Sequence, residues 1–132
     1  MESEPKKKIR DLLQRQEESK TDKAAIDLLK ALLLMYGSAW ESELKDMLMM
    51  IWSIRGLGLD EMGEMQAALN EAEKILQEAG LITIEEKARG DLGKSEPITE
   101  KLYTTKHLFL LMRLLRDSEL DKLRFQLQGG EI

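Results

Sequence analysis

The spacing of apolar residues changes at Leu81, and this change constrains the fold more than any other feature of the chain. Before it, apolar side chains recur every three or four residues over 60–79, as in an amphipathic helix. From Leu81 onward, LITIEEK at 81–87 alternates β-branched and polar residues, as a strand does. EKLYTT at 100–105 is a second candidate strand, and the Gly-, Pro- and charge-rich residues between the two predict a β-hairpin.

Helical spacing predicts four helices before the hairpin and one after it. The four run from Pro5 onward, from Thr21 or Asp22 to Tyr36, over 41–54 and over 60–79, and the last is one long amphipathic helix over 106–128. Ser38 and Glu41 have the spacing of a capping box for the third helix, and Asp60 can cap the fourth. The predicted fold class is mainly α with one β-hairpin.

Composition excludes several classes of function. The 132 residues are 42% hydrophobic and 34% charged, which indicates one folded domain with a densely charged surface. Because the chain has no cysteine and a single histidine, His107, thiolate metal sites and disulfides are excluded. No nucleophile is paired with a base, so we expect no enzyme activity, no metal and no cofactor.

Location is predicted from the same composition. The longest apolar run, at 31–35, is far shorter than the roughly 20 residues that cross a membrane, and the first residues lack the apolar stretch of a signal peptide. We therefore expect a cytoplasmic protein with no membrane partner. A single asparagine, no cysteine and many Glu, Lys and Arg residues resemble thermophile composition.

The order of three helices, a hairpin and a further helix is that of a winged helix-turn-helix domain. The segment 75–115 resembles MarR-like and PadR-like transcription regulators in a leucine-containing turn, a Leu-Ile strand, a charged loop and a Tyr-Thr-Thr strand: Leu76, Gly80, Leu81, Ile82, the loop at 88–99, Tyr103, Thr104 and Thr105. The resemblance covers about residues 22–115. It implies a winged-helix core at 21–105 with a helical extension at 1–20 and a C-terminal amphipathic helix and tail at 106–132.

The resemblance implies a DNA-binding transcription regulator that forms a homodimer. Polar residues of the recognition helix at 60–79 would read base edges: Gln66, Asn70, Lys74 and Gln77. Bases of the hairpin, or wing, would contact phosphates: Lys87, Arg89, Lys94 and Lys101. An apolar stripe of the last helix would form the dimer interface: Leu108, Leu111, Met112, Leu115 and Leu123.

The charge of the recognition helix supports an alternative. Residues 60–79 carry six acids and one base, a net charge of −5, and such a helix repels DNA phosphates. The wing is neutral, with five bases and five acids over 85–106. The alternative is a winged-helix module for protein–protein interaction in a larger assembly, whose partner is a basic protein surface.

Overall fold

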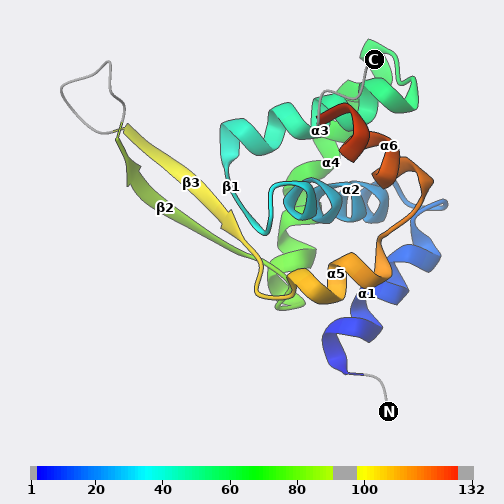
Figure 1. Cartoon of the computed structure of the whole chain (residues 1–132), viewed down its shortest axis with the longest axis horizontal. Coiled ribbons are helices and arrows are strands. Elements are labelled where there is room, and N and C mark those ends of the chain that lie inside the picture. Colours follow the sequence, from blue (N-terminus) through cyan, green and yellow to red (C-terminus); the bar gives the residue numbers. More distant parts are fainter. Residues whose placement is uncertain (1–2, 91–97, 128–132) are drawn as a thin grey trace.

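A computed structural model describes residues 3–90 and 98–127 (Figure 1). Within these residues the chain forms six α-helices and a three-stranded antiparallel sheet. In chain order the elements are α1 (Glu4–Arg15), α2 (Lys20–Leu34), β1 (Ser38–Trp40), α3 (Glu41–Arg55), α4 (Leu59–Glu78), β2 (Thr83–Arg89), β3 (Ile98–Thr104), α5 (Leu108–Leu114) and α6 (Ser118–Leu127). The mainly helical class is confirmed, and the sheet has one strand more than the predicted hairpin.

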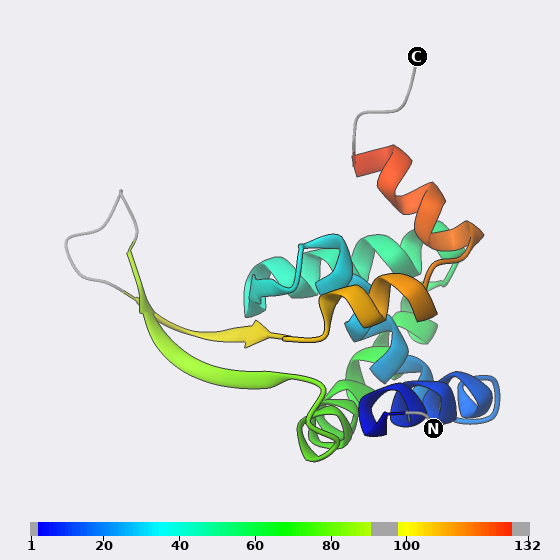
Figure 2. The ribbon, with the colours of Figure 1, turned by 60° about the horizontal axis from the view of Figure 1, so that its bottom comes forward.

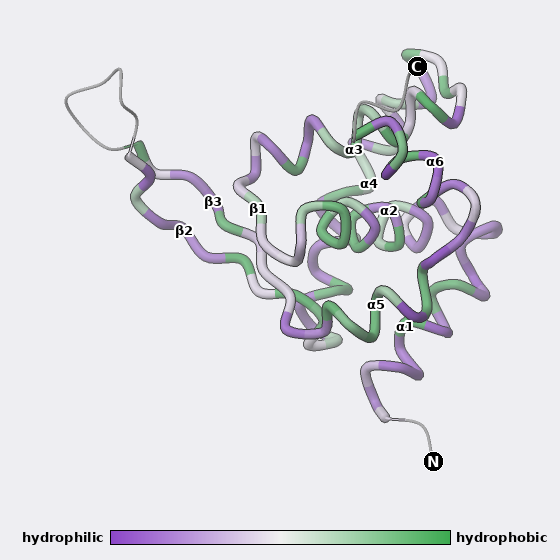
Figure 3. The backbone as a smooth tube through the Cα atoms, in the orientation of Figure 1, coloured by the Kyte–Doolittle hydropathy of each residue, from purple (hydrophilic) through white to green (hydrophobic). Residues whose placement is uncertain are grey.

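Helix α2 lies in the middle of the helical body, and α1, α3, α4 and α5 pack against it (Figures 1 and 3). Every residue from Ala24 to Leu34 is buried. The hydroxyl of Ser19 accepts a hydrogen bond from the backbone N–H of Asp22 at 3.2 Å, so Ser19 is the cap and the helix begins at Lys20, before the predicted start at Thr21 or Asp22. The helix ends before Gly37, whose φ of 93° is a left-handed conformation that favours glycine.

The sheet contains the predicted hairpin. Strand β2 pairs with β3 from Thr83 opposite Thr104 to Arg89 opposite Ile98, and the short strand β1 pairs with the other edge of β3. The predicted capping box of Ser38 and Glu41 is wrong, because the backbone of 38–40 bonds to β3 and no side chain caps α3. Beyond β1 the hairpin projects away from the helices (Figures 1 and 2).

Helix α4 begins at Leu59, two residues before the start that a cap at Asp60 predicts. Gly58, not Asp60, precedes the first turn, and the carboxylate of Glu61 accepts a hydrogen bond from the backbone N–H of Gly58 at 3.3 Å.

The C-terminal region is two helices, so the prediction of one helix over 106–128 is wrong. The chain leaves α5 after Leu114, and a carboxylate oxygen of Asp117 accepts a hydrogen bond from the backbone N–H of Leu120 at 2.8 Å, which caps α6. Figure 2 shows α6 turned away from the axis of α5. The break allows Leu111 and Leu120 both to enter the core, which also holds Ile9 from α1.

Candidate nucleic-acid interface

The four residues that the sequence assigns to base reading all lie exposed on α4 at spacings of three or four residues: Gln66, Asn70, Lys74 and Gln77. Such spacings place them on one side of the helix. Gln66 and Asn70 line a hollow between α3 and α4. Gln77 lines a shallow depression at the base of the hairpin, together with Thr83 and Thr104. The structure therefore brings the four onto one surface, which we call the polar stripe.

The acids of α4 lie mostly on a different side of the helix. Four of them recur at spacings of four and seven residues and form a second stripe, which we call the acidic stripe: Asp60, Glu64, Glu71 and Glu78. This stripe is turned towards α1 and the start of α2. Glu64 forms an ion pair with Lys20, and Glu78 lines a depression with Lys8 and Arg15 of α1.

The other two acids make contacts within the domain. Glu61 accepts from Gly58, as described above, and a carboxylate oxygen of Glu73 accepts a hydrogen bond from the Tyr103 hydroxyl at 2.9 Å. The net charge of −5 is therefore unevenly distributed around α4, and the polar stripe contains only one charged residue, the base Lys74.

Arg89 of the wing is engaged with its own domain. Its guanidinium lies over the ring of Trp40 at 5.3 Å from the centroid and bonds to the carboxylate of Glu100 at 2.8 Å. The backbone N–H of Ser42 donates to the same carboxylate at 2.7 Å. Hydrogen bonds from Ser42 and Arg89 lower the pKa of the Glu100 carboxyl to about 2. These contacts tie the hairpin to the start of α3, a role that sequence analysis did not assign to Arg89.

The remaining wing bases lie at different places along the hairpin. Lys87 is exposed and lies 3.6 Å from the carboxylate of Glu85 on the same strand. Lys101 is half-buried and lies opposite Glu86 in the sheet register. Lys94 falls outside the described residues. Lys87 is thus the described wing base that is placed best for contact with a phosphate.

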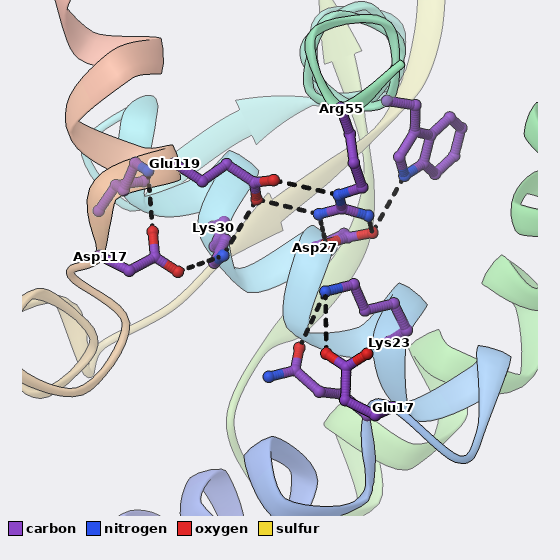
Figure 4. Close-up of polar contacts among 10 residues, drawn as sticks. Glu17, Lys23, Asp27, Lys30, Arg55, Asp117 and Glu119 are labelled. Atoms are coloured by element: carbon purple, nitrogen blue, oxygen red, sulfur yellow. Dashed lines mark hydrogen bonds and ion pairs between the residues drawn. The ribbon is translucent and has the colours of Figure 1, made fainter. Parts of the chain in front are cut away.

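An ionic cluster that sequence analysis missed joins α2, α3 and α6 (Figure 4). The carboxylate of Asp27 is fully buried and accepts hydrogen bonds from the guanidinium of Arg55 at 2.7 and 3.0 Å and from the indole N–H of Trp52 at 3.0 Å. The ammonium of Lys30 lies 2.8 Å from Asp117 and 3.1 Å from Glu119.

Each of the two bases in this cluster contacts two carboxylates. Arg55 also donates to Glu119 at 3.0 and 3.1 Å. Burial raises the pKa of Glu119, but Arg55 and Lys30 outweigh it and lower that pKa to about 2. Asp27 and Lys30 interrupt the apolar sequence AAIDLLKALLL, and that interruption is the pattern that indicates a buried polar cluster.

The residues assigned to the dimer interface are mostly internal. Leu111, Leu115 and Leu123 are buried in the core of the chain itself, and this corrects the expectation that they face a second copy. Their burial follows from the break between α5 and α6. Leu108 is half-buried and Met112 is exposed. Phe109 exposes 79% of its surface, so α5 offers to solvent one predicted apolar side chain, Met112, and one that was not predicted, Phe109.

The hollow between α3 and α4 has a volume of about 200 Å³. Buried apolar side chains form its floor: Leu48, Trp52 and Leu69. Its polar lining comes from both helices: Glu41, Lys45, Gln66, Asn70 and Glu73. It is thus a cavity whose rim includes half of the polar stripe.

No metal site is found among residues 3–90 and 98–127, since no group of three or more His, Cys, Asp or Glu side chains is placed to hold an ion. In the same residues, no helix is both long and apolar enough to cross a membrane. Comparisons of the chain with protein-family models, with curated proteins and with solved structures found no match.

Proposed function

We propose that this chain is a winged-helix DNA-binding domain that acts as a homodimeric transcription regulator, with α4 as its recognition helix and the β2–β3 hairpin as its wing. The order of α2, α3, α4, the hairpin and α5 supports this proposal. One observation carries it further than the sequence does: four of the six acids of α4 lie on the acidic stripe, turned towards α1 and the start of α2, while the polar stripe is exposed on another side of the helix and its Gln77 lies at the base of the hairpin.

The polar stripe has the chemistry for base reading. A glutamine or asparagine amide can form two hydrogen bonds with the N6 and N7 edge of adenine. The major groove of B-DNA, where this edge is exposed, is wide enough for a helix. Lys74 on the same stripe would contact a phosphate or guanine. The exposed Lys87 would add a phosphate contact from the wing. For a second copy, α5 offers Phe109 and Met112.

Fluorescence anisotropy with mixed-sequence duplex DNA at low and moderate salt tests the proposal. We expect binding at low salt that weakens as salt rises. Asn70→Ala should change which duplexes are preferred, because discrimination against the wrong base at the position that Asn70 contacts should fall by roughly 1–3 kcal/mol. The matched control is Glu71→Gln, one residue along on the acidic stripe, which should leave that preference unchanged.

The second candidate function is a protein-interaction module, and two observations favour it. Helix α4 carries six acids against one base, and Arg89 is engaged with Glu100 and Trp40. This candidate predicts no DNA binding by the wild type even at low salt, and binding to a basic protein surface through the acidic stripe. If the Glu71→Gln/Glu78→Gln variant gains DNA binding that the wild type lacks, the acidic stripe excludes nucleic acid and the regulator proposal fails.

A further inference from the structure

The hollow between α3 and α4 has an uncompensated negative charge. Glu41 lies 3.7 Å from the ammonium of Lys45, one turn along α3, so the hollow already holds a cation for this carboxylate. Glu73 is half-buried and, among the described residues, forms no ion pair with a base. Two carboxylates and one ammonium give the lining a net charge of −1.

The hydroxyl that contacts Glu73 does not neutralise it. Tyr103 is buried, and burial together with the hydrogen bond to Glu73 raises the pKa of its phenol well above the usual range. The phenol therefore keeps its proton and donates one hydrogen bond at 2.9 Å. A carboxylate can accept about four hydrogen bonds, so Glu73 retains capacity for a donor inside the hollow.

The rest of the lining suits a donor attached to a short apolar chain. The side-chain carbonyls of Gln66 and Asn70 are further acceptors at the rim. Leu48, Trp52 and Leu69 form an apolar floor. At about 200 Å³ the hollow is smaller than a drug-sized pocket of roughly 300 Å³ or more, so its ligand is small.

We propose that this hollow binds a small organic cation, a primary amine or guanidinium on a short apolar chain, with its charged group against Glu73. Gln66 and Asn70 belong to both the hollow and the polar stripe, so the bound cation and DNA compete for the same side chains. The competition rests on the proposed function, whereas cation binding does not.

Two-dimensional NMR of the isotope-labelled chain, titrated with butylguanidinium or butylammonium chloride, tests the site without DNA. We expect saturable shifts of the side-chain amides of Gln66 and Asn70, and much smaller shifts with the neutral analogue n-butanol. No saturable shift with either cation, or equal affinity for n-butanol, overturns the proposal. Tighter binding of acetyl-Gly-Arg-Gly-amide than of butylguanidinium would instead assign the hollow to an arginine of a protein partner.

Three variants separate recognition of charge from folding. Glu73→Gln keeps an acceptor for Tyr103 and should weaken binding about tenfold, because one charge-assisted hydrogen bond is lost. Lys45→Gln removes the competing cation and should strengthen binding. Glu71→Gln, on the acidic stripe, should leave it unchanged. Equal weakening in Glu73→Gln and Glu71→Gln would overturn the assignment to Glu73.

Competition is measured separately, by titrating butylguanidinium into the complex of the wild type with DNA at constant ionic strength. Guanidinium chloride serves as the control for non-specific screening. Release of DNA by the butyl compound alone supports the shared site. If the cation binds the free chain but does not displace DNA, competition is refuted and the cation site stands. If the chain binds the cation but no DNA, the proposed function fails and the cation site stands.

Discussion

Replacement of Asp27 by alanine tests the ionic cluster of α2, α3 and α6. The change removes three hydrogen bonds, two from Arg55 and one from Trp52. It leaves the indole N–H buried without an acceptor, and it leaves the guanidinium with Glu119 as its remaining carboxylate in the cluster. Removal of one partner of a buried ion pair costs about 3–5 kcal/mol. Because Glu119 still balances the charge of Arg55, we expect the free energy of unfolding to fall by about 3 kcal/mol, the lower end of this range.

Urea unfolding followed by tryptophan fluorescence and circular dichroism measures this loss. The matched control is Asp22→Asn, another acid of α2, whose partner Arg15 is exposed over 56% of its side chain. Asp22 is buried, but its partner Arg15 is solvated and asparagine keeps a carbonyl acceptor for it, so the control should lose less stability than Asp27→Ala.

A double variant, Asp27→Leu/Arg55→Met, tests the physical reasoning. Both variants leave the indole N–H of Trp52 without its acceptor, but only the double variant also removes the buried charge of Arg55, so it should be more stable than Asp27→Ala. If Asp27→Ala loses less than about 1 kcal/mol, the buried carboxylate does not hold the three helices together. If the double variant is no more stable than Asp27→Ala, unpaired charge is not the cause of the loss.

Three further predictions concern pH, salt and assembly. Glu119 has a pKa of about 2 in the folded chain, below the roughly 4.3 of a glutamate in the unfolded chain. Its contribution to stability is therefore complete above about pH 4.3 and is lost as the pH falls towards 2. Between about pH 5 and 2, the melting temperature of Glu119→Gln should fall less than that of the wild type. Lys87→Ala should lower the slope of log affinity against log salt by about 0.9. Arg89→Ala should lower the melting temperature without changing that slope, and an equal fall in slope for both variants would contradict the contacts of Arg89. Phe109→Glu should convert a dimer into a monomer in light scattering while circular dichroism stays unchanged, and a wild type that is already monomeric at tens of micromolar would refute the dimer.

The hairpin and most helices could be predicted because they depend on local periodicity. The alternation from Leu81 onward predicts β2, and helical spacing predicts α3 and α4 to within a few residues. Strand β1 could not be predicted, since three residues give no period and Ser38 is spaced from Glu41 like a capping box. Only pairing with β3, distant in sequence, decides that these residues are extended.

The break between α5 and α6 has a local sequence pattern that also fits the interior of one continuous helix. Asp117 and Ser118 are residues that favour helix starts, but the leucines on both sides continue the helical spacing. The capping bond from Leu120 to Asp117 and the pairing of Asp117 with Lys30 decide in favour of two helices. Lys30 lies 87 residues away in the sequence, so this second contact cannot be predicted from the sequence of the segment alone.

Helix α3 is fixed at both ends, and this positions the candidate sites. At its start, the backbone N–H of Ser42 bonds to Glu100 of the hairpin. At its end, Arg55 bonds to buried Asp27 and to Glu119. The hollow and half of the polar stripe lie between these two anchors. Since moving α3 would break charge-assisted contacts at one end or the other, ligand or DNA should be accommodated by side chains such as Gln66 rather than by a shift of the helix.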